Sequence, residues 1–404
     1  MGGGGEDYSP GSGDDPEMIN SEMAGAGSVW ARAEDFWQVV GWGFNCSVGH
    51  EGRWGVWRGW VGFMVEVLEE DWGVRMGMGG EMEGGEGEEG GSGEKGVEGS
   101  LIVRYLRLEG GKLGGNRRVV RAVFADGGAK ALNEFGEVFR NETRGRRGGE
   151  GGLKRMERKV NVEEGEFADY LEEDDDDDDG DDDVVGGKPA LEPASKDATS
   201  ALHDSSTDAS ALLGGMDALT LRLRLLALLS SVADALPPHF LPVGALYDLY
   251  NDHIRPLPVA TFQLFVSPSS TLPTFSPVAR SALNQFILRS LIASSAPNPP
   301  TDDLDQHLLE RYFLPYAANT ASVADNAKVS LLLESLLRLV LGYIGVRGTD
   351  GLERAVRVGI EAREKKGCGD HRKRAGAKVM EEEDRAWLVG SGERLRALLE
   401  VCKE

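Results

Sequence analysis

Residues 35–72 read DFWQVVGWGFNCSVGHEGRWGVWRGWVGFMVEVLEEDW and hold six of the eight tryptophans of the chain. Their large apolar residues recur every three or four positions, which is the spacing of one face of an α-helix. Residues 50–53 interrupt this pattern, so the sequence predicts two helices joined as a hairpin. Gly55, Gly59 and Gly62 weaken the second helix by about 1 kcal/mol each relative to Ala. Such a helix is stable only when its aromatic stripe is buried.

The tryptophans of this hairpin have two readings. Trp54 and Trp57 share a helical stripe with Val61, which is typical of side chains in a hydrophobic core. Large aromatic residues at the margin of such a stripe can instead anchor a protein partner. We expect most of the indoles in the core and keep three margin residues as partner-binding candidates, namely Trp42, Trp60 and Trp72. Stacking on nucleic-acid bases is not expected, because the hairpin has few basic residues and such platforms need a positive groove.

Helical spacing continues outward from the hairpin, and no segment alternates at period two for more than a few residues. Further helices are predicted over residues 99–108, 116–124, 129–141, 219–236, 243–253, 259–265, 277–294, from 301 onward, 331–344, 351–363 and 381–401. Ser322 and Asp325 resemble a capping box ahead of residues 331–344, which are apolar on most of their circumference and belong at the centre of a fold. We therefore predict an all-α fold, an irregular helical array that is HEAT-like in shape only, with long disordered inserts.

Composition divides the chain into five parts. Glycine, serine and acidic residues dominate the segments that are predicted to be disordered. The parts are a disordered start (1–27), an N-terminal helical module with a Gly/Glu linker at 77–96 (28–143), a disordered basic-then-acidic linker (144–215), a C-terminal helical domain (216–346), and C-terminal helices with a basic loop (347–404).

Cysteine usage and hydropathy indicate where the protein resides. Cys46, Cys368 and Cys402 lie far apart without a CxxC pair, which favours a reducing compartment over a disulfide framework. The start MGGGGEDYSPGSGDD lacks the apolar core of a secretory signal, and no stretch of eighteen apolar residues is present. We expect a soluble intracellular protein that has no membrane partner.

The net charge of −24 is concentrated in one segment. Residues 160–185 carry fifteen acidic residues and no basic ones, so more than half of the net charge belongs to this run. An acidic run attracts basic partners such as histones, and it can equally be a solvated spacer. Its continuous core is retained as a partner-binding candidate: Asp174, Asp175, Asp176, Asp177, Asp178 and Asp179.

Two basic clusters have the two-part spacing that nuclear import receptors read on flexible segments. The first precedes the acidic run and the second lies near the C-terminus. The import candidates are Arg146, Arg147, Lys154, Arg155, Lys365, Lys366, Arg372, Lys373 and Arg374. Ordinary surface lysine and arginine is the competing interpretation. We predict residence in the nucleus, with the cytoplasm as the alternative.

Several patterns that resemble ligand sites lack a required residue. Residues 85–90 and 91–96 match dinucleotide-binding glycine spacing, but no strand precedes them and their glutamates would repel phosphate. Residues 175–186 begin like a calcium loop and end on Gly186, where a bidentate Glu is needed. The histidines are scattered without metal-ligand spacing. A helix-turn-helix over residues 117–141 is disfavoured for DNA by acidic residues on its second helix. We predict no cofactor, no metal and no catalytic residue.

Two blocks of the chain resemble uncharacterised helical proteins of filamentous fungi. They are residues 35–72 and residues 221–344, the second of which contains HIRPLP, LPYAANT and ADNAKVSLLLESLLRL. The resemblance covers less than half of the chain. It implies an α-helical fold, brings no named activity and transfers no catalytic residue.

The reading that unites these observations is a non-enzymatic nuclear protein that binds protein partners through helical surfaces, as a scaffold. One alternative is a chromatin-associated factor that uses the acidic run to bind histones or other basic proteins. Another is an enzyme with a site between the helical domains, which a pocket with converging polar groups would support.

Overall fold

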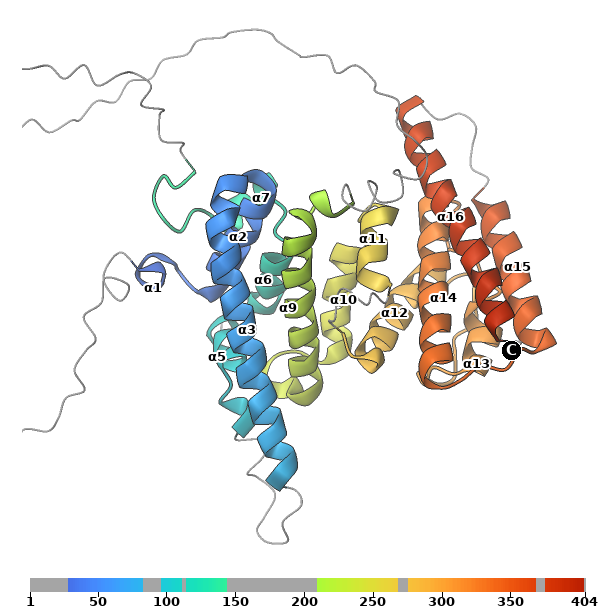
Figure 1. Cartoon of the computed structure of the whole chain (residues 1–404), viewed down its shortest axis with the longest axis horizontal. Helices are drawn as coiled ribbons and strands as arrows, with labels where there is room; N and C mark the ends of the chain where they lie inside the picture. The colour runs from blue at the N-terminus through green and yellow to red at the C-terminus, as the bar shows by residue number, and fades with distance from the viewer. Residues whose placement is uncertain are drawn as a thin grey trace, which may run out of the picture.

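The computed structural model describes residues 28–82, 96–110, 114–143, 209–267, 275–367 and 375–402. Within these ranges the chain forms helices and no strand, which confirms the predicted all-α class. The helices follow one another in approximately chain order, from α2 and α3 at one end to α15 and α16 at the other (Figure 1). This succession confirms the irregular helical array. The residues 1–27 that were predicted to be disordered, and most of both predicted linkers, lie outside the described ranges.

The helix bounds agree with most of the predicted segments. They are α1 (Val29–Arg32), α2 (Phe36–Gly49), α3 (Glu51–Met82), α5 (Leu101–Gly110), α6 (Gly115–Val123), α7 (Ala129–Glu134), α9 (Gly215–Ala235), the 3-10 turn η1 (Pro237–His239), α10 (Val243–Ile254), α11 (Val259–Val266), α12 (Pro277–Ile292), α13 (Gln306–Leu308), the π-helical turn η2 (Leu309–Phe313), α14 (Val323–Tyr343), α15 (Asp350–Lys366) and α16 (Ala375–Val401).

Several boundaries differ from the prediction, among them the end of α7, which stops at Glu134 where a helix was predicted to residue 141. Helix α3 continues to Met82, into the segment predicted as a Gly/Glu linker. The helix predicted from Thr301 begins only at Gln306, because the Asp305 carboxylate supplies the cap by accepting a hydrogen bond from the Leu308 N–H (2.6 Å). In the predicted 144–215 linker, residues 209–213 are part of the described structure, and Ser210 and Leu213 are buried.

The tryptophan-rich hairpin is formed by α2 and α3, as predicted, with only His50 between the two helices. The stripe of α3 that carries Trp54, Trp57 and Val61 is buried. Gly41 of α2 permits the closest approach in this region, since a Cβ there would lie 2.3 Å from the Phe135 ring. The aromatic core therefore extends from the hairpin to the segment that follows α7.

Helix α9 joins the N-terminal helices to the rest of the array. It packs against α3 on one side and α10 on the other, so it is buried on both faces. Arg222 of α9 is fully buried and donates to main-chain carbonyls of α2 and of the end of α6. The predicted N-terminal module and C-terminal domain thus share one continuous hydrophobic core.

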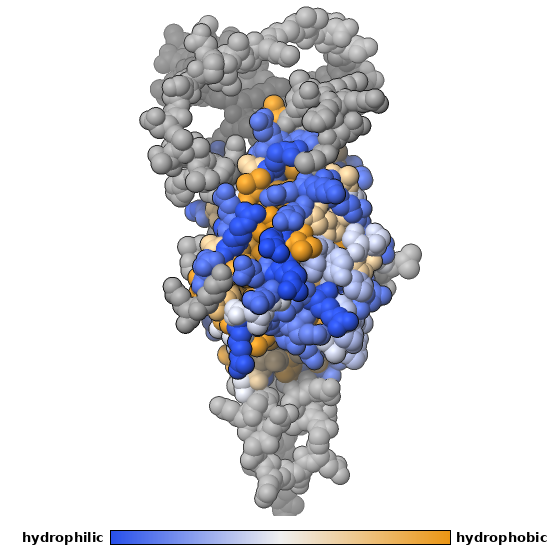
Figure 2. Space-filling view, turned by 90° about the vertical axis from the view of Figure 1, so that its right-hand side faces the viewer, coloured by the Kyte–Doolittle hydropathy of each residue, from blue (hydrophilic) through white to orange (hydrophobic). Residues whose placement is uncertain are grey.

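Helix α14 is the centre of the C-terminal half, as its all-round apolar sequence predicted. It contacts α11, α12, α15 and α16, and its N-cap is the predicted Ser322, whose hydroxyl accepts from the Asp325 N–H (3.4 Å). Fully buried Arg363 of α15 holds the segment after η2 against α14. The outer face of α15 and α16 is mostly hydrophilic, with hydrophobic residues in small separate groups (Figure 2). A polar outer face of this kind closes an array at its end.

Candidate functional site

Two adjoining cavities open along helix α12. The first, of about 450 Å³, lies between α10, α12, residues 302–304 and the C-terminal end of α14. The second, of about 630 Å³, lies between α3, α9, α10 and α12. Val243, Tyr247, Val278 and Ala282 line both cavities, so the two adjoin and are treated together. We call the pair the α12 groove.

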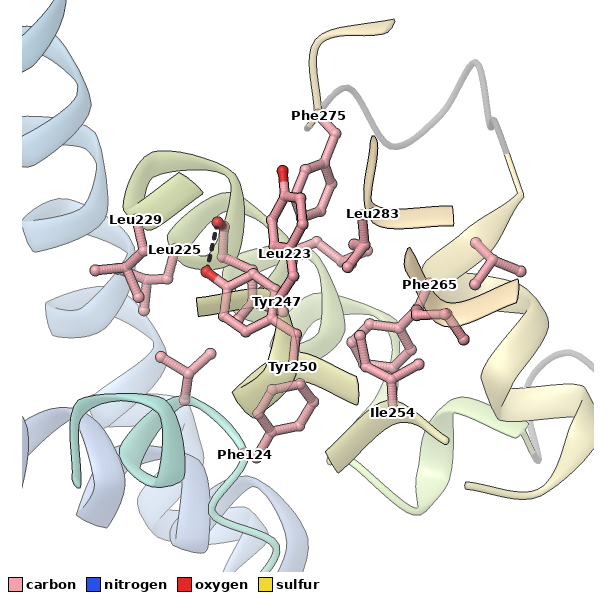
Figure 3. Close-up of a cluster of buried hydrophobic side chains, with 14 of the residues drawn as sticks. Phe124, Leu223, Leu225, Leu229, Tyr247, Tyr250, Ile254, Phe265, Phe275 and Leu283 are labelled. Carbon is pink, nitrogen blue, oxygen red and sulfur yellow. Dashed lines mark hydrogen bonds between the residues drawn. The ribbon is translucent and has the colours of Figure 1, made fainter. Parts of the chain in front are cut away.

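The floor of the groove is rigid. Tyr247 is only 3% exposed, and its hydroxyl donates to the main-chain carbonyl of Ala279 (3.3 Å). Burial raises the pKa of this phenol, so it remains a neutral donor at physiological pH. Beneath it, Leu283 of α12 and Tyr250 of α10 belong to the cluster of buried side chains drawn in Figure 3. A partner would therefore meet a preformed surface.

The walls of the first cavity expose large apolar side chains. Val278 is 79% exposed in the first turn of α12, which Ser276 caps and Pro277 opens. Tyr343 and Ile344 are 71% and 60% exposed at the end of α14. Single exposed apolar residues are ordinary, but these three line the same cavity.

Charged residues border the groove at both ends. At the end near α14, Arg289 pairs with Asp302 (2.6 Å) and Asp303 is exposed. At the end near α3, the Arg224 Nε donates to both Glu69 carboxylate oxygens (3.1 and 3.0 Å). Each arginine that lines the groove is therefore paired with a carboxylate.

Two carboxylates remain beyond these pairs. Among the described residues, no ion pair is formed by Asp303 or by Asp234, which is exposed at the α3 end. Arg280 lies just outside the lining, near Tyr343, and burial lowers the pKa of its guanidinium. The Arg280 guanidinium offsets Asp303 at the α14 end, and Asp234 is the excess carboxylate at the α3 end.

The structure places the three tryptophans proposed as partner-binding residues at different depths. Trp42 and Trp72 are only 2% and 5% exposed, so the prediction that they offer a free aromatic surface is corrected: helical packing covers both. Trp72 nevertheless lines the second cavity, where its indole N–H donates to the Ser231 hydroxyl (3.0 Å). Trp60 is half-buried and packs edge-on to Trp57.

Most charged candidates lie outside the described residues. They are Arg146, Arg147, Lys154, Arg155, Arg372, Lys373 and Arg374 of the basic clusters and Asp174 to Asp179 of the acidic run. Lys365 and Lys366 are described, and they occupy the last turn of α15 and not a flexible loop. Cations at this end of a helix interact favourably with its dipole. The Lys366 ammonium also donates to the Ser295 hydroxyl (3.4 Å).

The groove residues were not found by reasoning from sequence. Val278, Asp303 and Tyr343 belong to three separate segments, and nothing in their local patterns links them. The one available signal was the pair Tyr343 and Ile344, which ends an apolar helix directly before a glycine in the left-handed conformation, Gly345 (φ 84°). Such residues lie past the last covered turn of the helix.

The strongly shifted titratable groups belong to the packing. Burial raises the pKa of the Cys46 thiol to about 12, which removes it as a nucleophile at neutral pH. Burial also lowers the pKa of His253, whose ring stacks on Phe124 (4.8 Å between centroids). In the described part of the chain, no group of three or more His, Cys, Asp or Glu side chains could hold a metal ion. None of the described helices combines the length and the apolar character needed to cross a membrane.

The second cavity lies where an enzyme site between helical domains would be. Its polar groups bond to one another: Arg224 to Glu69, Trp72 to Ser231, and Tyr247 to the main chain. Among the described residues that line it, none is His, Cys or Lys, and the charged side chains are Glu69, Arg224 and Asp234.

Comparison of the chain with models of protein families, with curated proteins and with solved structures gives no match. The functional argument therefore rests on the α12 groove itself, a preformed pair of adjoining cavities that charged residues border.

Proposed function

We propose that this protein is a non-catalytic scaffold that binds a protein partner in the α12 groove. The observation that carries the proposal is the set of three exposed apolar side chains, Val278, Tyr343 and Ile344, around one open cavity. Covering a fully exposed valine or isoleucine side chain is worth about 1.5–3 kcal/mol. An aromatic residue such as Tyr343 is a favoured anchor at protein interfaces.

The helices that form the groove and the residues that line it both favour a binding role. It is built on helices whose inner faces are packed, so few side chains must be ordered when a partner binds. Its lining is predominantly apolar near α14, as in sites that take apolar side chains of a partner.

The test uses two double variants of the full chain. Val278→Gln with Ile344→Gln removes apolar surface from the groove. Val358→Gln with Val389→Gln is the matched control, because both valines are 43% exposed on α15 and α16, away from the groove lining. All four positions are exposed, so both variants are expected to fold, which circular dichroism would check.

A photo-crosslinking amino acid at Ala282, which lines both cavities, identifies the partner in cells by mass spectrometry. We expect the crosslinked partner to persist in the control variant and to be lost in the groove variant. A partner captured equally by both would contradict the proposal.

We also propose that the protein acts in the nucleus, on the support of its two basic clusters. A fluorescent fusion is expected in nuclei, and replacement of all the import candidates by Ala should leave it in the cytoplasm. A wild-type fusion that never enters nuclei would reject this location.

A further inference from the structure

A separate cavity, of about 220 Å³, lies where α11, α14 and α16 meet, and we call it the polar cavity. It shares no lining residue with the α12 groove. Every residue of its described lining is polar or charged: Gln263, Ser267, Glu334, Ser335, Arg338 and Arg394. The charges of this lining therefore determine what the cavity can bind.

Glu334 is the one carboxylate in the described lining, and its oxygens are already bonded. The side chain is buried, and the Arg394 Nε donates to both of its oxygens (2.8 and 3.0 Å). The Arg338 Nη2 (2.9 Å) and the Ser391 hydroxyl (3.0 Å) donate to it as well. A ligand cation would compete with two guanidinium groups for this carboxylate, so the cavity does not favour a cation.

The two arginines leave positive charge in excess. Two guanidinium groups face one carboxylate in the lining, and α11 carries no charged residue that could offset the difference. The residues one helical turn from either arginine supply no second carboxylate. They are Gly390, Ser391, Ala397 and Leu398 on α16, and Ser335, Leu341 and Gly342 on α14.

Hydrogen-bond donors are in excess too. The Arg394 Nη2 is buried without a hydrogen-bond partner among the described residues, and such a donor gains most from a new acceptor. The main-chain carbonyl of Val266, at the end of α11, is no free acceptor. It is bonded by the Asn284 Nδ2 (2.9 Å) and the Ser335 hydroxyl (2.7 Å).

We propose that the polar cavity binds a tetrahedral oxyanion such as phosphate. Guanidinium groups bind phosphate oxygens with charge-assisted hydrogen bonds. The donors of this cavity come from three helices, and a tetrahedral anion presents acceptor oxygens on several sides. This site goes beyond the proposed binding of a partner in the α12 groove and can be tested separately from it.

The probe is radiolabelled inorganic phosphate, and equilibrium dialysis against the full chain measures the phosphate bound. All samples have the same ionic strength, because contacts of partly exposed arginines weaken with salt. We expect one saturable site per chain. Unlabelled phosphate and sulfate should displace the label, whereas acetate should displace it much less, since it has only two oxygens and a single charge.

Variants place the phosphate in the polar cavity. Gln263→Glu adds a carboxylate to the lining without removing any bond of Glu334, and should weaken phosphate binding by at least about tenfold. Arg338→Gln removes one cation and leaves Glu334 bonded to Arg394 and Ser391, and should weaken it by about five- to tenfold.

Arg396→Gln is the matched control. It makes the same change of charge at an exposed arginine of α16 that does not line the cavity, so phosphate binding should be unchanged. Circular dichroism would check that all three variants fold.

Three results would overturn the proposal: no saturable binding to the wild-type chain, binding that survives Gln263→Glu, or an equal loss in Arg396→Gln. The second would place the phosphate elsewhere, for instance on the basic clusters. O-phosphoserine distinguishes the source of the anion. Displacement of the label by this ester would identify a phosphate monoester as a ligand, and displacement by inorganic phosphate alone would restrict the site to the free ion.

Discussion

The two halves of the array each contain a fully buried arginine, and the two arginines differ in how completely they are bonded. Arg222 of α9 donates to the carbonyls of Leu213 (3.3 Å), Ala125 (2.7 Å) and Val123. It also reaches the Phe44 carbonyl (3.4 Å), and its guanidinium lies 4.2 Å from the centre of the Phe44 ring. Its acceptors come from three separate segments of the chain.

Arg363 of α15 has fewer acceptors. It donates to the Ser330 hydroxyl (3.0 Å) and to the carbonyls of Leu314 (3.0 Å) and Tyr316 (3.1 Å). Its Nη2 has no hydrogen-bond partner among the described residues. Burial lowers the pKa of both guanidinium groups to about 9, so both are cations at neutral pH.

The difference shows what a buried arginine does in this fold. Val123 ends α6, and Leu314 directly follows η2. Both arginines therefore donate to carbonyls at the end of a helix, where no intrahelical N–H is in place to donate to them. Arg222 does this while joining α9 to three other segments, whereas Arg363 joins α15 to α14 and to one loop. The N-terminal joint, which is the packing of α9 against α2 and α6, should therefore lose more stability than α15 when its buried arginine is replaced.

Arg222→Met should have the largest effect and would break the N-terminal joint. Methionine fills similar space without donors, and each buried carbonyl left unbonded costs about 1–3 kcal/mol. We expect the free energy of unfolding to fall by on the order of 5 kcal/mol, measured by chemical denaturation. Arg224→Met on the same helix is the control and should cost about 1 kcal/mol or less, because its ion pair with Glu69 is partly exposed.

Trp57→Ala tests whether the aromatic core of the N-terminal half contributes as much to the free energy of unfolding as Arg222 does. The indole is 3% exposed and donates to the Glu142 carboxylate (3.2 Å), so truncation leaves a cavity and a buried acceptor. A loss of about 3–5 kcal/mol is expected in a thermal or urea melt. Half-buried Trp387 of α16 supplies the comparison. An equal loss for Trp387→Ala would show that the loss of stability does not depend on how deeply the indole is buried.

Arg363→Met sharpens the comparison from the other half of the array. Because fewer carbonyls lose a donor, we expect a loss of about 3 kcal/mol in the same denaturation assay. A loss as large as that of Arg222→Met would reject the idea that the number of joined segments decides the effect.

Glycine substitutions should give the smallest effects, with opposite signs in α15 and α3. At Gly359 an added Cβ would lie 1.8 Å from the Leu314 carbonyl oxygen, so Gly359→Ala displaces the loop that Arg363 binds and should cost about 2 kcal/mol. At Gly59 nothing lies within 4 Å, so Gly59→Ala should stabilise the protein by up to about 1 kcal/mol. Thermal midpoints that shift in the same direction would contradict this pair.

The helices that carry the fold could be predicted from the sequence because their periodicity is local. The hairpin and the central α14 both follow from the spacing of apolar residues, whereas the burial of α9 on two faces became visible only in the structure. The two arginines of α9 could not be distinguished in this way. Arg222 and Arg224 both stand between leucines, yet one is fully buried and the other pairs with Glu69 near the surface.

The α12 groove could not be predicted for a related reason. Val278 reads as an ordinary first-turn residue and Asp303 as part of a helix start, and that helix in fact begins later. Whether these residues line a groove depends on which segments become neighbours in the fold, and the local pattern of a single sequence does not contain that information.

The contacts of Arg222 also impose an order of events on protein synthesis. Its acceptors Phe44 and Val123 precede it by 178 and 99 residues. At 5–20 residues per second, a nascent chain has Phe44 in place roughly 10–40 s before Arg222 is added. During that interval the apolar face of the hairpin that α9 later covers remains open to solvent.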